Sequence, residues 1–301
     1  MTASREHLAR ALWTLFEPIH AVTYFSDEAR AAFAAIGFPR YWDGYFAGRS
    51  APLGAVAGAP VTAIFSGFAP FLVDRALPAA WSVAEPAVVL EARLAGSEAT
   101  LRRLVPDEDV VERAAAALAP IAAGVDTIGR PLAAANAALP AQADPYRRLW
   151  QSAATLREHR GDGHVIALVS LDIAGLTTLL LRTGVDLEAG SLRKARGWSE
   201  EEWTVEADRL IDRGLLHADR TTTSAGLELL AEAERVTNRL AVDPLAHLDD
   251  AGLREVARAI HPVSIAVGEL FPYPNPIGMP VPWNPDTDPD AREIPAVPAP
   301  N

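Results

Sequence analysis

Three consecutive pieces of sequence decide the fold: VDLEAGSLRKARG (185–197), WSEEEWTVEADRLIDRGLL (198–216) and HADRTTTSAGLELLAEAERV (217–236). Apolar residues recur at helical spacing in the first two pieces and again from Leu227 onward. Gly197 lies between the first two pieces and suits the end of a helix, while Ser199 suits the start of the next. The predicted order is therefore helix, turn, helix, short wing, helix.

This order predicts a winged helix, but its charge is unusual for a unit that binds DNA. Residues 185–243 contain eight basic and thirteen acidic residues, a net charge of −5. The second helix begins with three glutamates (200–202), at the end that faces base edges in DNA-binding modules. Glutamates also stabilise the N-terminus of any helix, but binding to phosphates needs cations. The charge disfavours DNA binding and favours a winged helix that serves in packing or dimerisation.

Residues 164–240 resemble the MarR family of winged-helix regulators. The resemblance rests on the segment DRLIDRGLL (208–216), a shortened wing, and the residues from Thr221 to Gly226. The whole chain resembles more closely an uncharacterised actinobacterial family that is labelled only by its helix-turn-helix. That likeness rests on EPIHAVTYF (17–25), GYFAGRSAPLG (44–54) and LREHRGDGHVIALV (156–169). The resemblance implies a helical N-terminal domain joined to a MarR-like winged helix, and it implies no particular reaction.

Composition narrows the class of protein. The chain has 301 residues, half of them hydrophobic, with a net charge of −12 and no cysteine. Disulfides and thiolate metal sites are therefore excluded, and the acidic balance disfavours general affinity for nucleic acid or anionic membranes. No apolar run approaches the roughly 18 residues of a membrane-spanning helix. We expect a cytoplasmic protein without a membrane partner.

The helical periodicity and the breaks between helices predict a mostly α fold. We expect a helical N-terminal domain over 1–140, a winged-helix domain with a minimal β-wing over 145–270, and a proline-rich disordered tail over 271–301. Pro18 should interrupt the first helix, and the proline-rich tail should be dispensable for folding, although Tyr273 and Trp283 could lie along the body. Helices are predicted over residues 6–16, 29–36, 61–76, 85–104, 107–123, 145–159, 164–181 and 249–270.

The segment RGDG (160–163) is the first candidate site. Gly161 and Gly163 break the helical pattern, and two imidazoles, a carboxylate and a guanidinium fall within six residues: His159, Arg160, Asp162 and His164. Such a cluster suits the binding of a small anion or a metal ion, or proton transfer. The structural alternative, which we favour, is that Gly161 ends one helix and Asp162 caps the next. The spacing of the histidines matches no known metal motif, so no metal site is predicted.

Two further candidates lie near the N-terminus. His20 and Tyr24 are one helical turn apart in an apolar setting, so they could line a pocket or pack in the core. Arg49 follows a group of aromatic residues and could hold a carboxylate with both arms of its guanidinium. Its structural alternative is an ion pair with Glu17, Asp27 or Asp43.

Three functions fit these features. The leading one is an intracellular protein that binds a small molecule in a pocket between the domains and keeps an acidic, degenerate winged helix. The first alternative is a ligand-responsive regulator of the MarR type that binds DNA as a homodimer, and the second is an enzyme with His, Tyr and Arg groups for acid–base chemistry. The sequence identifies no cofactor. In the leading hypothesis His20, Arg49 and His159 or His164 share one cavity, which requires segments about 110 residues apart to meet.

Overall fold

The computed structural model describes residues 4–271, 278–279, 281–288 and 291. In these residues it contains fourteen α-helices and no β-strand, only one antiparallel bridge between Leu216 and Thr222. The mostly α fold class is confirmed. The first eight helices are α1 (Arg5–Phe25), α2 (Asp27–Ala35), α3 (Tyr41–Ser50), α4 (Gly58–Ile64), α5 (Pro70–Asp74), α6 (Pro86–Leu104), α7 (Glu108–Ala123) and α8 (Pro131–Ala137). The other six are α9 (Pro145–Ser170), α10 (Leu176–Thr183), α11 (Ala189–Arg196), α12 (Glu200–Asp212), α13 (Ser224–Leu240) and α14 (Asp250–Val267).

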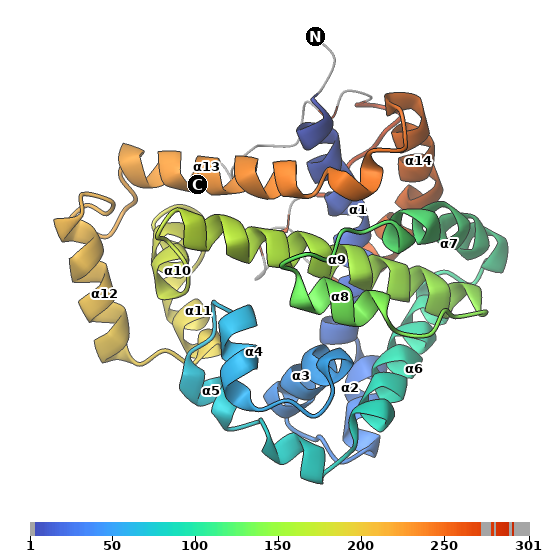
Figure 1. The fold of residues 1–301 in the computed structure, drawn as a ribbon, viewed down its shortest axis with the longest axis horizontal. Coiled ribbons are helices and arrows are strands. Elements are labelled where there is room, and N and C mark those ends of the chain that lie inside the picture. Colours follow the sequence, from blue (N-terminus) through green and yellow to red (C-terminus); the bar gives the residue numbers. More distant parts are fainter. Residues whose placement is uncertain (1–3, 272–277, 280, 289–290, 292–301) are drawn as a thin grey trace.

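Helix α9 crosses the middle of the molecule and organises the rest (Figure 1). Helix α13 runs beside it along the top of the view, α7 and α14 cover its right end, and α2 to α6 lie below. Helices α10 to α12 form the left edge, with α11 next to α5. One long helix therefore contacts both the N-terminal helices and α13, the last helix of the predicted winged helix.

Buried apolar side chains form three clusters. The central core joins residues of α1, α6, α7, α9 and α14, including Leu15, Leu118 and Trp150. The aromatic core gathers Phe33, Phe38, Phe46, Phe65 and Phe68 with aliphatic residues of α4 to α6 and α8. The third cluster fills the space between α10, α12 and α13. The aromatic core supports helices α3 to α6, and the third cluster joins the helices of the predicted winged helix.

Helix α9 corrects the prediction made for RGDG. The helix runs without a break from Pro145 to Ser170, so Gly161 ends no helix. A Cβ at Gly163 would lie 2.8 Å from Nη1 of Arg130, so this glycine makes room for an arginine that bonds the carbonyls of His159 and Leu240. Glycine marks a close approach here rather than a helix end. The predicted helix 164–181 is likewise wrong, because a turn at 171–175 separates α9 from α10.

Two other boundary predictions are wrong. Helix α1 continues through Pro18 to Phe25, and all residues around this proline, from Thr14 to Thr23, are buried. Tertiary packing therefore outweighs the hydrogen bond that proline cannot make. The predicted helix 61–76 is two short helices, α4 and α5, because Pro70 starts a new helix after the turn at Gly67. By contrast, Ser26 caps α2 and Asp107 caps α7, as their sequences indicate.

The described part of the proline-rich segment packs on the body. Phe271, Met279, Trp283 and Ala291 belong to the central core. The backbone N–H of Trp283 donates to Oγ1 of Thr14 at 2.9 Å, and its indole donates to the carbonyl of Asp288 at 2.7 Å. Trp283 thus lies along the body, as the sequence allowed, while the dispensability of the whole tail for folding stays a prediction. Most of the predicted disorder, and Tyr273, fall outside the described residues.

Candidate functional site

Helices α10 to α13 form a complete helix-turn-helix unit with a minimal wing. Ser199 caps α12 from its side chain, and Glu202 completes a capping box by accepting from the Ser199 backbone. Gly197 ends α11 with φ +78°, a left-handed conformation that glycine adopts without strain. Leu216 and Thr222 form the base of the wing. Local sequence signals thus place α12 as the second helix of the motif.

The exposed face of α12 is acidic. Its exposed side chains are those of Glu200, Glu201, Glu202, Val205, Asp208, Arg209 and Asp212. The only cation in this group, Arg209, is already bonded to Glu206. The cations beside α12 that are exposed to solvent are Lys194 at the end of α11 and Arg220 in the wing. A DNA duplex would meet more negative than positive charge here, which weakens binding.

The helix-turn-helix turn is fastened to the N-terminal helices. The N–H of Ala69 donates to the carbonyl of Arg196 at 2.9 Å, and the indole of Trp198 donates to the carbonyl of Gly67 at 3.1 Å. The Arg196 guanidinium lies 4.4 Å from the ring centroid of Phe68. A Cβ at Gly197 would lie 2.7 Å from Cβ of Leu72, so the turn meets α5 at close range. The aromatic core and the turn are therefore in direct contact.

Arg49 is joined to α9 by a buried ion pair. Its Nε and Nη2 donate to the two carboxylate oxygens of Glu158 at 2.9 and 3.0 Å. Arg157 donates to the same carboxylate at 3.0 Å and also faces Glu17 at 3.4 Å. Burial alone would raise the pKa of Glu158, but the cations of Arg49 and Arg157 hold it well below its usual range. The predicted partners of Arg49 were Glu17, Asp27 and Asp43; Glu158 takes that place instead.

His20 and Tyr24 lie beside this ion pair. The Tyr24 hydroxyl is 3.4 Å from Nε2 of His20, and the His20 ring stacks on Trp150 with centroids 6.0 Å apart. Burial, followed by the charge of Arg157, lowers the pKa of His20 well below its usual value. Burial raises the pKa of Tyr24 well above its usual value. Neither group titrates near neutral pH, which does not favour an acid–base role.

The other candidates lie on different faces of α9. Asp162 accepts from the backbone N–H of Leu132 and of Ala133, both at 2.9 Å, and so caps α8 instead of a helix after RGDG. Burial raises the pKa of Asp162 to about 6. His164 bonds the hydroxyl of Thr237 at 2.9 Å, and burial lowers its pKa to about 4.

Arg160 pairs with Glu234 and donates to Oδ1 of Asn238 at 3.0 Å. His159 is buried with a pKa lowered to about 4 by burial, and its Nε2 has no hydrogen-bond partner in the described residues. Arg160 and His159 line a space of only about 10 Å³, roughly what one water needs. The structure therefore brings His20, Tyr24 and Arg49 together and leaves His159, Arg160, Asp162 and His164 elsewhere.

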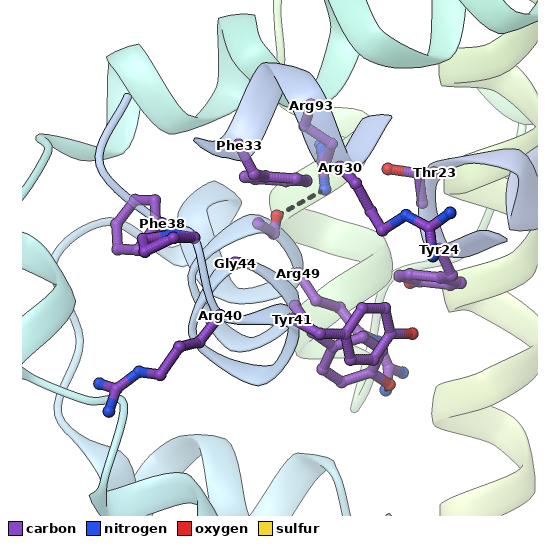
Figure 2. Close-up of a pocket in the computed structure, with 13 residues that line it drawn as sticks. Thr23, Tyr24, Arg30, Phe33, Phe38, Arg40, Tyr41, Gly44, Arg49 and Arg93 are labelled. Atoms are coloured by element: carbon purple, nitrogen blue, oxygen red, sulfur yellow. Dashed lines mark hydrogen bonds between the residues drawn. The ribbon is translucent and has the colours of Figure 1, made fainter. Parts of the chain in front are cut away.

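A larger cavity opens beside Tyr24 and Arg49 (Figure 2). Its volume is about 110 Å³. Buried residues form its floor and exposed residues its mouth; the lining residues are Thr23, Tyr24, Arg30, Phe33, Phe38, Pro39, Arg40, Tyr41, Gly44, Tyr45, Gly48, Arg49 and Arg93. All of them belong to α1, α2, α3, α6 or the α2–α3 connection. The cavity thus lies within the predicted N-terminal domain, not between two domains.

Two glycines of α3 shape this cavity. A Cβ at Gly48 would lie 2.5 Å from Cζ of Phe33, and a Cβ at Gly44 would lie 3.2 Å from Cγ of Phe33. The phenyl ring therefore rests against bare backbone on one face of α3. Alanine at Gly48 would force the ring to move, so the glycine spacing in DGYFAGR keeps Phe33 in place beside the cavity.

Sequence reasoning missed Arg93, Thr23 and Glu158 as members of this region. Arg93 lies on α6, whose sequence suggests a charged outer face, yet its side chain is buried. Glu158 lies in the segment LREHRGDGH, whose histidines, and not this glutamate, are predicted site residues. A signal was present for Arg93, since it recurs at helical spacing with the apolar residues Val89 and Leu101.

The described residues contain no group of three or more His, Asp or Glu side chains that could hold a metal ion. Among the same residues no helix is both long and apolar enough to cross a membrane.

The comparisons with known proteins agree with the geometry of α10 to α13. A family model described as a helix-turn-helix family matches residues 9–271, and the chain belongs to that family. No curated protein and no solved structure gives a significant match. The helix-turn-helix part of the predicted resemblance is thereby confirmed, while the MarR-like subdivision and an actinobacterial origin stay predictions.

Proposed function

We propose that this protein is a ligand-responsive transcriptional regulator. In this proposal the cavity among α1, α2, α3 and α6 receives a small molecule, and the unit α10–α13 contacts DNA in the MarR manner as part of a homodimer. Membership of a helix-turn-helix family supports the DNA-binding part. The observation that carries the proposal is the contact between the helix-turn-helix turn and the aromatic core, which also borders the cavity.

The path from the cavity to the turn is short. Tyr45 lines the cavity, and its ring centroid lies 5.5 Å from that of Phe68. Phe68 in turn lies under the guanidinium of Arg196 in the turn. A ligand that moves Tyr45 therefore displaces a ring on which the turn rests. By linkage, the factor by which the ligand changes the affinity for DNA equals the factor by which DNA changes the affinity for the ligand.

The DNA contact in this proposal depends on few cations. Lys194 and Arg220 flank α12 and are exposed, so they are the groups available to phosphates. The glutamates at the start of α12 oppose them, so we expect affinity weaker than the roughly 10⁻⁸ M typical of specific complexes. Two copies of the unit on a two-fold symmetric site would double the number of phosphate contacts, as in other dimeric helix-turn-helix proteins.

A second candidate function is a small-molecule-binding protein whose winged helix does not contact DNA. The acidic exposed face of α12 favours it. It shares the cavity with the first proposal and differs only in the partner of α10–α13, so a DNA-binding experiment separates the two.

The experiment is selection of bound duplexes from a random library at about 50 mM and 150 mM salt, followed by titration of the enriched sequence. The regulator predicts an enriched sequence with two half-sites and a complex that contains two protein chains. Lys194→Ala and Arg220→Ala should each weaken binding and reduce the salt slope by about two, one for each chain of the dimer. Arg113→Ala, an exposed arginine on α7, is the matched control and should change neither. If no sequence is enriched even at the lower salt concentration, the regulator is rejected and the second candidate stands.

A further inference from the structure

One arginine of the cavity differs from the other three in its charge balance. Arg30 pairs with Asp27, Arg40 with Asp43, and Arg49 with Glu158. Arg93 forms no ion pair with any described residue; its Nη1 donates to the carbonyl of Gly48 at 3.1 Å and its Nη2 to Oδ1 of Asn136 at 3.2 Å. Figure 2 shows Arg93 reaching toward α3, with the bond to Gly48 drawn as a dashed line. Its guanidinium also lies 5.1 Å from the ring centroid of Trp150. Among the described residues, Arg93 is thus a cavity cation without an anionic partner.

Burial makes this cation costly. Arg93 is only 7% exposed, and its Nε has no hydrogen-bond partner in the described residues. Burial lowers its pKa to about 10, so the guanidinium stays charged at neutral pH. A buried charge is normally paired, so an anion that enters the cavity gains from the uncompensated charge of Arg93.

Hydroxyl groups around the cavity add donors for the same anion. Oγ1 of Thr23 is buried and has no hydrogen-bond partner in the described residues. The hydroxyl of Tyr45 accepts from Nη1 of Arg49 at 3.2 Å, which leaves its own proton free to donate. The donors thus exceed the acceptors, as expected for a site that binds an oxyanion.

The remaining walls are aromatic and suit a single ring. Phe33, Phe38 and Tyr24 line the inner part, and Tyr41, 42% exposed, stands at the mouth. The volume of about 110 Å³ is somewhat smaller than the ~150 Å³ cavity that admits benzene. A nucleotide is far too large for this space, whereas a single six-membered ring fits when its charged end points toward Arg93 and its far end stays in the open mouth beside Tyr41.

We propose that this cavity binds a monocyclic aromatic carboxylate, with Arg93 as the cation that neutralises the carboxylate. The inference rests on the proposed sensing role of the N-terminal helices and gives that role a ligand class. The charged end bonds Arg93 and the Thr23 hydroxyl, and the ring packs against Phe33 and Phe38. Thr23 selects for an acceptor, and the aromatic walls select for a flat apolar body.

The test is calorimetric titration of the full chain with benzoate, and with benzamide as a neutral molecule of nearly the same shape. We expect benzoate to bind with a dissociation constant of about 1 mM or tighter, and benzamide to bind at least tenfold more weakly. Thr23→Val removes only the unpaired hydroxyl, so it should leave the melting temperature unchanged or raise it. The same variant should raise the dissociation constant for benzoate severalfold. Arg93→Met should abolish the preference for benzoate, and Arg93→Lys should restore part of it.

Arg103→Met serves as the matched control, because Arg103 lies on the same helix but is exposed and paired with Glu28. It should bind benzoate like the wild type. If benzoate does not bind, or benzamide binds equally well, the proposal is overturned; if Arg93→Met fails to fold, Thr23→Val and Arg93→Lys still decide it. These titrations contain no DNA. Benzoate binding without a DNA complex would reject the regulator alone, and a DNA complex without benzoate binding would reject this ligand class alone.

Discussion

Neutralising Glu158 should destabilise the protein more than neutralising any exposed carboxylate. Its side chain is 3% exposed and accepts from both arms of Arg49, whose own side chain is 10% exposed. In Glu158→Gln the shape is kept and the charge is lost. Arg49 then has no carboxylate partner among the described residues, while Arg157 keeps Glu17 at 3.4 Å.

The size of the effect follows from burial. Removing one partner of a buried ion pair costs about 3–5 kcal/mol, because a charge remains in a poorly solvated site. The glutamine keeps one acceptor oxygen and Arg157 keeps its second partner, so we expect a value near 3 kcal/mol. For a protein of this size, that loss lowers the melting temperature by roughly 5–10 °C.

The assay is urea unfolding followed by circular dichroism, with a matched control on the surface. Glu91 also accepts two hydrogen bonds from one arginine, from Nη1 and Nη2 of Arg147 at 3.2 and 2.9 Å, but its side chain is 61% exposed. Glu91→Gln should cost less than about 1 kcal/mol. The double variant Arg49→Met with Glu158→Gln should cost less than the sum of the two single changes, because the pair is already lost in either one. Equal losses for Glu158→Gln and Glu91→Gln would refute the reasoning.

Three further predictions concern other groups. Because burial raises the pKa of Asp162 to about 6, the folded state disfavours the ionised carboxylate, and the stability that this group contributes falls as pH rises from about 4 to 6. The free energy of unfolding of Asp162→Asn should therefore rise by up to about 3 kcal/mol relative to that of the wild type between pH 4 and pH 7. A constant difference between the two proteins across that range would contradict this. His164 has a pKa lowered to about 4 by burial, and Thr237 already donates its hydroxyl proton to Ala233 at 2.7 Å, so nitrogen NMR should find a neutral ring with its proton on Nδ1 at pH 6; a charged ring there would disprove the assignment. Trp283→Ala should cost about 3–5 kcal/mol in urea unfolding because the indole is buried in the central core, while Val281→Ala, 63% exposed, serves as the control and should cost little.

The helix-turn-helix could be predicted from the sequence because its signals are local. Ser199 and Glu202 are three residues apart, and the left-handed turn at Gly197 falls within the same short segment. Such caps act through neighbouring backbone groups and do not depend on the rest of the fold. The same local rules failed at Pro18 and at RGDG, since packing from distant helices decides the backbone there.

The candidate site could be predicted only in part. His20, Tyr24 and Arg49 were identified because aromatic and charged residues adjoin them in sequence. Their link to α9 depends on Glu158, which is 109 residues from Arg49, and no short-range pattern reports that contact. Arg93 is important because no carboxylate among the described residues pairs with it. An unpaired buried cation becomes visible only when α3, α6 and α8 are in place.

Ligand control of the turn is feasible on energetic grounds. Two hydrogen bonds, from Ala69 and from Trp198, hold the turn, and each contributes about 1 kcal/mol net. The contact of Arg196 with Phe68 adds about 1–2 kcal/mol, so releasing the turn costs about 3–4 kcal/mol. A ligand at one hundred times its dissociation constant that binds only one state shifts the equilibrium by about 2.7 kcal/mol, which is close to that cost. A turn held much more tightly would not be released by such a ligand, and a turn held much more loosely would be free without it. The contacts described here therefore lie in the range where a small molecule can shift the equilibrium between the held and the released turn.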